Sequence, residues 1–353
     1  VIRPQRHFDT ILYTGNSSSG GSGSSQNISG LEFKPDFIWI KNRDATYYHN
    51  LSDTVRGITR SLNSNATDVE VNYSNITAAH EHGFNVGANE LVNKSGQNLV
   101  AWCWKAGGTA VSNSDGTITS SVSANTVAGF SIVSYTGNET NDATVGHGLG
   151  KSPDMVIIKD RVSNSAGNNW YVFHSSLASG HYVKLNQTSA TTAVSGTSNG
   201  GVGSVTSTTF NFVQGTTGNN KNVNESGDTF IAYCWTEIPG YSKFGSYTGN
   251  GVSDGTVVHT GFKVAFLITK RVNEARNWII YDNKRGPFNE VDNFLEADQV
   301  SAEDPKDMID FLSDGFKLRD SDSDVNEGNS TYIYMAFAEQ PGPTPFDTFA
   351  NCR

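Results

Sequence analysis

Hydrophobic and polar residues alternate along this chain in short runs, and clusters of Gly, Asn, Asp and Ser separate the runs. Short apolar runs with period-two alternation predict β-strands, and Gly–Asn or Asp–Gly pairs between them predict tight turns. The turns recur at the spacing that is typical of antiparallel sandwiches. The pattern therefore predicts an all-β chain.

Four landmarks recur three times in the same order. A first strand ends in a Tyr-Thr-Gly-Asn turn, and a second apolar run ends in a basic pair. A third segment follows, and a Gly–Phe strand, an Asn-rich turn and a last apolar strand close the copy. The first strands are "FDTILYTGN" (8–16), "FSIVSYTGN" (130–138) and "YSKFGSYTGN" (241–250), and the second runs are "PDFIWIKNR" (35–43), "PDMVIIKDR" (153–161) and "VAFLITKR" (264–271). Such a repeat predicts three homologous domains of ordinary size.

We expect tandem antiparallel β-sandwiches, of jelly-roll or concanavalin-like type, over 5–111, 125–238 and 239–341. Residues 112–124 form either a linker or an added strand, and 342–353 form an extended tail. The third unit also contains "DPKDMIDFLSDG" (304–315), which predicts a short helical insertion. Asp304 would be its N-cap, Pro305 its first residue and Gly315 its C-terminal stop.

Composition and charge narrow the class of protein. Of the 353 residues 36% are hydrophobic and 17% charged, which argues against disorder. The net charge of −10 disfavours a nucleic-acid partner. No apolar run approaches the roughly 18 residues of a membrane span. Because the sequence begins with Val, we expect a processed chain or part of a longer one. Cys103 and Cys234 occupy the same place in two similar strands, which favours buried thiols.

The repeated turn is the first candidate site. The favoured interpretation is a β-turn with a half-buried Tyr, in which Gly–Asn accepts positive φ. The alternative is a glycan-contacting edge, with tyrosine rings for stacking and asparagine amides for hydrogen bonds. The candidate ligand-binding residues are Tyr135, Asn138, Tyr247 and Asn250. The basic pairs after the second runs favour rim charges at strand ends, with an anion- or glycan-binding role as the alternative. These pairs are Lys41/Arg43, Lys159/Arg161 and Lys270/Arg271.

A second candidate lies in "DSDSDVNEGN" (320–329), where alternating Asp320, Asp322 and Asp324 resemble a calcium loop. Val325 stands where an EF-hand requires Gly, and the other units lack these acids, so a solvated hairpin tip is favoured over calcium. No other cofactor is expected. The sequence contains no nucleophile elbow, phosphate loop or zinc motif, and we expect no enzymatic activity.

Long stretches of the chain resemble a repeat region of marine bacteriophage structural proteins, described as tail-fibre-like or virion-associated. The similar stretches are "LVAWCWKAGGTAVSNSDGTITSSVSANTVAGFSIVSYTGN" (99–138), "GHGLGKSPDMVIIKDR" (146–161), "YSKFGSYTGNG" (241–251), "DFLSDGFKLRDSDSDVN" (310–326) and "TYIYMAFAEQP" (331–341). In those proteins the region often follows laminin-G or concanavalin-like domains. The resemblance implies a virion-surface or extracellular location and carries no catalytic residues.

The resulting hypothesis is a tail-fibre or head-fibre module that attaches to host-surface glycans. Its expected partners are further copies of itself, as a homotrimer or other homo-oligomer, other virion proteins and a host glycan. Arrayed weak sites would gain avidity. The alternatives are a structural decoration or filament subunit without a ligand, and a secreted cellular lectin or adhesin. A depolymerase is the least favoured.

Overall fold

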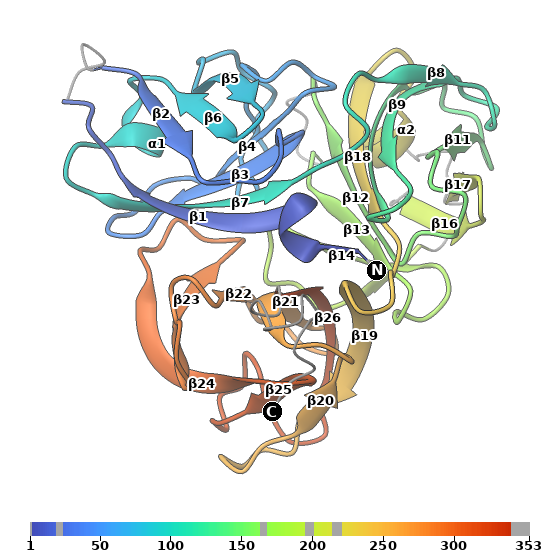
Figure 1. The fold of residues 1–353 in the computed structure, drawn as a ribbon. Coiled ribbons are helices and arrows are strands. Elements are labelled where there is room, and N and C mark those ends of the chain that lie inside the picture. Colours follow the sequence, from blue (N-terminus) through green and yellow to red (C-terminus); the bar gives the residue numbers. More distant parts are fainter. Residues whose placement is uncertain (1, 19–23, 163–167, 195–200, 214–220, 340–353) are drawn as a thin grey trace.

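The computed structural model describes residues 2–18, 24–162, 168–194, 201–213 and 221–339. The chain is almost entirely β, with 47% strand and 3% helix, and its sheets are antiparallel, which confirms the predicted all-β class. Figure 1 shows three lobes around a common centre. We call them units 1, 2 and 3 in chain order. The predicted tail, 342–353, lies outside the described residues.

Unit 1 is a sandwich of a four-stranded sheet, in the order β1-β7-β3-β4, and a three-stranded sheet, in the order β2-β6-β5. A short 3-10 turn, Pro4–Arg6, precedes it. Its elements are β1 (Phe8–Thr14), β2 (Gln26–Ser29), β3 (Phe37–Asn42), β4 (Asn50–Asp53), β5 (Ile76–His80), β6 (Gly83–Val86), α1 (Glu90–Asn93) and β7 (Asn98–Trp104).

Unit 2 has an eight-stranded sheet, in the order β15-β14-β13-β12-β18-β10-β9-β8, and a three-stranded sheet, in the order β11-β17-β16. Its elements are β8 (Val111–Asn113), β9 (Ser120–Asn125), β10 (Phe130–Thr136), β11 (Thr144–Gly146), β12 (Met155–Asp160), β13 (Tyr171–His174), β14 (His181–Lys184), β15 (Thr192–Ala193), β16 (Gly201–Val205), β17 (Thr209–Val213), α2 (Lys221–Asn224) and β18 (Thr229–Trp235). Of the two alternatives for 112–124, the structure shows added strands, because β9 pairs with β10 and β8 pairs with β9.

Unit 3 joins all its strands in one curled sheet, in the order β19-β26-β21-β22-β23-β24-β25-β20. Its elements are β19 (Ser242–Thr248), β20 (Val257–His259), β21 (Val264–Arg271), β22 (Trp278–Asp282), β23 (Val291–Glu296), β24 (Asp304–Leu312), β25 (Gly315–Leu318) and β26 (Thr331–Ala338).

The helix predicted over 304–315 is wrong. Residues 304–312 form β24, which pairs with β23 on one side and with β25 on the other. Leu312 pairs with Gly315, so Ser313 and Asp314 form a two-residue hairpin turn. Gly315, expected to stop the helix, is instead the first residue of β25 directly after this turn. Met308 and Ile309 are buried by the neighbouring strands, whose pairing overrides the weak helical pattern.

The central strands of each unit are buried on both faces. Along β3, Phe37 and Trp39 face a core that all three units share, while Ile38 and Ile40 face the interior of unit 1. The strands β12 and β21 divide their side chains in the same way. One sheet of each unit therefore belongs to two cores, and the shared core holds the three lobes together (Figure 1).

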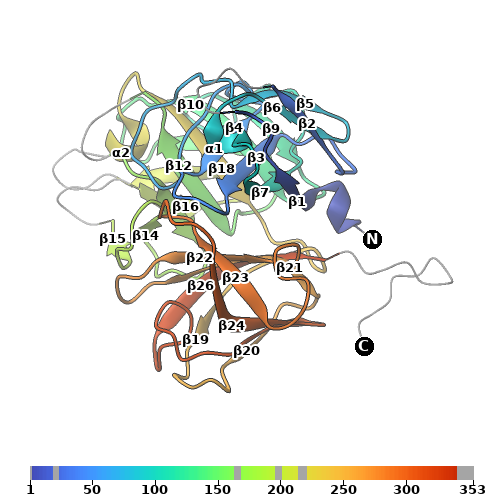
Figure 2. The ribbon, with the colours of Figure 1, turned by 90° about the vertical axis from the view of Figure 1, so that its left-hand side faces the viewer.

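Aromatic rings fill the middle of this shared core. Phe8 of unit 1 lies 4.9 Å from Phe337 of unit 3, centroid to centroid, and Phe37 of unit 1 lies 4.3 Å from Tyr233 of unit 2. Trp104 and Trp235 occupy equivalent positions, since they pair with Phe37 and Met155 at the same register. Figure 2, turned by 90°, shows unit 3 packed beneath units 1 and 2. No helix in the described part is long and apolar enough to cross a membrane.

Candidate functional site

Each Tyr-Thr-Gly-Asn turn is joined to the Asn-rich turn of its own unit. The hydroxyls of Tyr13, Tyr135 and Tyr247 donate to the carbonyls of Val92, Val223 and Val325, at 2.7, 2.7 and 2.8 Å. The next residues, Asn93, Asn224 and Asn326, accept from the backbone N–H of Asn16, Asn138 and Asn250 and donate back to their side-chain oxygens. We call this arrangement the Tyr–Asn clip.

The clip corrects the prediction that Tyr135 and Tyr247 offer stacking faces for a glycan. Both rings are buried, and burial raises both pKa values well above the ordinary range. Asn138 and Asn250 are exposed, but their side-chain oxygens already accept hydrogen bonds within the clip. The repeated turn is therefore an internal joint, and a ligand-binding role for the two asparagines stays a prediction.

Asp320, Asp322 and Asp324, the alternative calcium ligands, have the protein's own cations among their carboxylates, so calcium binding there stays a prediction that these contacts disfavour. The Lys306 ammonium contacts Asp322 and lies 3.8 Å from Asp320, and the Arg276 guanidinium lies 3.8 Å from Asp324. Within the described ranges, no group of three or more His, Cys, Asp or Glu side chains could hold a metal ion.

The sequence predicts that the lysines of the basic pairs are rim charges, and this prediction is wrong. Lys41, Lys159 and Lys270 are equivalent and fully buried, and their ammonium groups donate to backbone carbonyls. Lys159 also donates to Thr67 of unit 1, and Lys270 to Thr188 of unit 2. Burial lowers the pKa values to about 8 for Lys41, about 7 for Lys159 and about 8 for Lys270.

These lysines mark contacts between units, which we call seams, and the three seams lie at equivalent positions of the repeat. At each seam the residue two positions after the lysine accepts a backbone hydrogen bond from a neighbouring unit. The N–H of Glu70 donates to the carbonyl of Arg161 at 2.8 Å, that of Glu303 to Arg43 at 2.7 Å and that of Thr191 to Val272 at 2.8 Å. Unit 2 thus contacts unit 1, unit 1 contacts unit 3, and unit 3 contacts unit 2. The contacts run head to tail and close a ring within one chain.

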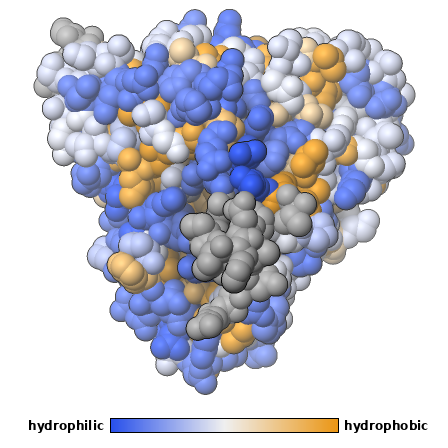
Figure 3. All heavy atoms as spheres, in the orientation of Figure 1, coloured by the Kyte–Doolittle hydropathy of each residue, from blue (hydrophilic) through white to orange (hydrophobic). Residues whose placement is uncertain are grey.

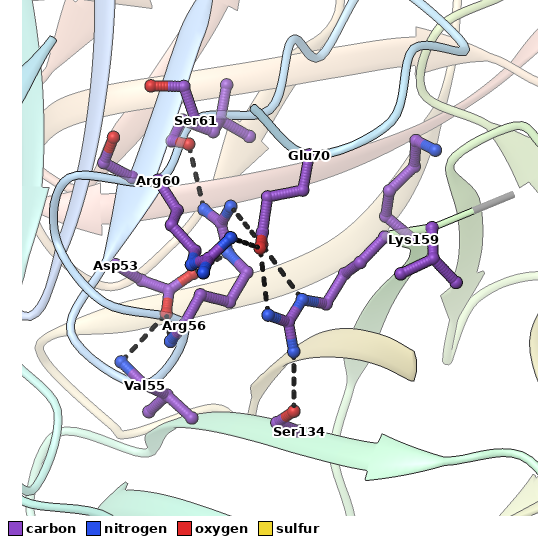
Figure 4. Close-up of polar contacts among 12 residues, drawn as sticks. Asp53, Val55, Arg56, Arg60, Ser61, Glu70, Ser134 and Lys159 are labelled. Atoms are coloured by element: carbon purple, nitrogen blue, oxygen red, sulfur yellow. Dashed lines mark hydrogen bonds and ion pairs between the residues drawn. The ribbon is translucent and has the colours of Figure 1, made fainter. Parts of the chain in front are cut away.

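The seam between units 1 and 2 carries a buried charge network around Glu70 (Figure 4). The Arg161 guanidinium donates to both carboxylate oxygens of Glu70, at 2.9 and 3.0 Å, and Arg56 and Arg60 each donate at 3.2 Å. Burial alone would raise the pKa of Glu70, but these guanidinium contacts outweigh it and hold that pKa below its usual range. Arg56 also pairs with Asp53, which accepts a hydrogen bond from the Tyr233 hydroxyl of unit 2.

The seam between units 3 and 1 repeats this network with equivalent residues. Arg43 donates to both carboxylate oxygens of Glu303, Arg285 bridges Glu303 and Asp282, and the Trp102 indole donates to Asp282 at 3.0 Å.

The seam between units 2 and 3 lacks these charges at every equivalent position. His174 and Thr191 stand at the positions of the carboxylates Asp53 and Glu70. Leu177 and Val272 stand at the positions of Arg56 and Arg161. Met335 stands at the position of Tyr233, whose hydroxyl is the donor to Asp53. His174 instead lies 3.1 Å from the backbone oxygen of Tyr334, and burial lowers its pKa to about 4. All five positions of this seam thus differ from those of the two charged seams. In the two charged seams the arginines and carboxylates bind one another, which indicates a structural role.

Among the clefts lined by described residues, two are candidate ligand sites. One, of about 700 Å³, lies where unit 1 meets the start of unit 2, and His7, Lys34, Asp36, Glu81 and Lys105 are among its lining residues. Its most buried acid, Asp36, already accepts from the Thr54 hydroxyl and the Ala106 N–H. The other, of about 330 Å³, lies on unit 3 beside Phe288, and we call it the Phe288 cleft. The sequence analysis did not identify this cleft, although the Gly286–Pro287 pair before Phe288 is a turn signal.

Fold and seams together define a class: a single-chain ring of three β-sandwich-type units around a shared core. The family model described as a domain of unknown function, DUF7483, matches residues 3–341. The chain belongs to this family. The match spans all three units. A search of curated proteins gave no match.

Proposed function

We propose that this chain is a surface module of a bacteriophage particle, in a tail fibre or head fibre, and that it attaches the particle to host-surface glycans. The proposal combines the resemblance of its repeats to virion structural proteins with the closed ring. The observation that carries it is the ring itself, in which three homologous units bury their inner faces in one core.

A ring of this kind suits attachment because its lobes keep a fixed spacing. Weak contacts made by different parts of a rigid body add to one another, since the second contact forms at high effective concentration. On the face shown in Figure 3 polar residues predominate and hydrophobic residues form small separate groups, as expected for a surface in contact with water and hydroxylated ligands.

The homotrimer predicted from the sequence stays a prediction. Threefold packing already exists within one chain, so a homotrimer would require a further surface. Sedimentation of the purified chain distinguishes the mass of one chain from that of three.

An adsorption assay tests the proposed function. The fluorescently labelled chain is mixed with a panel of marine bacteria, with and without enzymatic removal of surface polysaccharide. We expect binding to some strains and loss of binding after the polysaccharide is removed. Absence of binding to every strain would favour the second candidate, a ligand-free structural decoration or filament subunit, which the internally satisfied clips and seams also suit.

A further inference from the structure

Phe288 is the most exposed large hydrophobic side chain in the described part of the chain. Its exposed fraction is 82%, compared with 65% for Val111 and 63% for Tyr73. An exposed aromatic ring gains free energy when a ligand removes its surface from water. Exposure alone does not indicate a site, because single apolar residues occur on every protein surface. The surroundings of Phe288 supply the further evidence.

The loop that carries Phe288 is held on both sides. Before it, the Asp282 carboxylate accepts from the backbone N–H groups of Lys284 and Arg285, at 3.0 and 2.9 Å. After it, the Asn289 side chain donates to the Phe311 carbonyl and accepts from the Phe311 N–H, both at 2.9 Å. The ring is therefore presented on an anchored loop, which lowers the entropy lost when a ligand binds.

The repeat does not require this aromatic residue. Unit 1 has the same Asp-x-x-Arg-Gly motif, from Asp53 to Gly57, followed by Ile58 and Thr59. Unit 3 continues from its own motif with Pro287 and Phe288. Since both units build the same buried Asp–Arg pair, Phe288 is an addition to unit 3 and not part of the common architecture.

The cleft beside Phe288 combines an apolar wall with polar groups. Pro287, Val291 and Phe311 line it together with the Phe288 ring, and the Asn283 amide makes no side-chain hydrogen bond to another described residue. Both lysines at the cleft are balanced by carboxylates, Lys263 by Glu339 at 2.7 Å and Lys284 by Asp9 at 3.9 Å. The cleft therefore favours a neutral ligand with hydroxyl groups over an acidic one.

We infer that the Phe288 cleft binds a neutral saccharide ring, with the apolar C–H face of the sugar against Phe288 and its hydroxyls on Asn283 and the Lys263–Glu339 pair. A volume of about 330 Å³ suits one or two sugar rings, because ligand pockets start at about 300 Å³. This site assignment rests on the proposed function and identifies the part of the chain that would make the contact.

The test uses the whole chain and immobilised glucose, galactose, mannose and N-acetylglucosamine oligosaccharides, with sialylated and sulfated glycans for comparison. We expect binding to at least one neutral saccharide, a tenfold or greater loss in Phe288→Ala, and a smaller loss in Asn283→Ala. Tyr73→Ala removes a comparably exposed aromatic residue from unit 1 and should bind like the unmodified chain. Unchanged unfolding curves ensure that the variants are folded.

Three outcomes would overturn the assignment: undiminished binding by Phe288→Ala, binding only to acidic glycans, or no binding to any glycan. The adsorption assay separates this failure from that of the proposed function. If the unmodified chain and Phe288→Ala adsorb equally well to bacteria, attachment stands and the site lies elsewhere. If Phe288→Ala loses adsorption even to cells without polysaccharide, the cleft binds a protein and the saccharide assignment is wrong. If the unmodified chain adsorbs to no strain, the attachment function itself fails.

Discussion

The Arg161 guanidinium of unit 2 donates two hydrogen bonds, of 2.9 and 3.0 Å, to the Glu70 carboxylate of unit 1 at the buried seam between the units. The side chain of Glu70 is 5% exposed, and that of Arg56, which also contacts it, is fully buried. The geometry joins two homologous units of one chain as a salt bridge would join two subunits of an oligomer.

Replacing Glu70 by Gln should destabilise the whole ring. The substitution keeps the shape but leaves the buried Arg56 and the half-buried Arg161 short of a counter-charge, and breaking a buried pair costs ~3 kcal/mol or more. Urea unfolding measures the change in the free energy of unfolding. Thr191→Val, at the equivalent position of the uncharged seam, is the matched control and should change it little. Equal effects of the two substitutions would contradict the role assigned to the charge network.

The three buried lysines predict that stability increases with pH above neutrality. Their folded-state pKa values, about 8, 7 and 8, lie below the ordinary value of 10.5, so the unfolded chain binds more protons between these limits. Stability should therefore rise from about pH 7 to about pH 9.5, which is still below the ordinary ionisation of tyrosine. Thermal unfolding at the two pH values tests this, and the rise should shrink in Lys159→Met. A flat or falling melting temperature would contradict it.

Calcium should not stabilise the unmodified chain, because the Lys306 ammonium already pairs with Asp322 and lies 3.8 Å from Asp320. We expect the same melting temperature with EGTA as with about 1 mM calcium, a concentration at which weak extracellular sites fill. The Lys306→Ala variant should have a lower melting temperature in EGTA, because Asp320 and Asp322 then lack the lysine. Calcium should restore part of the lost melting temperature. A calcium-dependent rise in the unmodified chain would contradict the assignment of Lys306 as the resident cation.

Much of the fold could be predicted from the sequence, because strands and turns are local signals. The three units show directly in the repeated landmarks. The runs "FIWI", "MVII" and "AFLI" carry a further signal, because they are continuously apolar. An antiparallel strand that is buried on one face alone would alternate apolar and polar residues. Such runs require burial on both faces, and they mark the strands that face the shared core.

The candidate site was harder to predict because its determinants are contacts between distant residues. Lys41 follows an apolar run in the way that exposed strand-end lysines do, yet it is fully buried and its ammonium group donates to the backbone carbonyls of Asn42 and Ala45. The sequence predicts a half-buried ring for Tyr135, but the ring is buried and its hydroxyl donates to the carbonyl of Val223, 88 residues away in α2. The helix predicted at 304–315 failed for a different reason, because the segment pairs with β23 on one side and with β25, through a two-residue hairpin, on the other.

The central claim is that the three units unfold together, and differential scanning calorimetry of the purified chain tests it most directly. Units that share one core and three closed seams should unfold together, because no unit can leave without exposing the inner faces of the other two. We predict a single transition whose calorimetric enthalpy equals its van't Hoff enthalpy. Two or three separate transitions, or a calorimetric enthalpy several times the van't Hoff value, would show that the units are independent domains and would contradict the shared core.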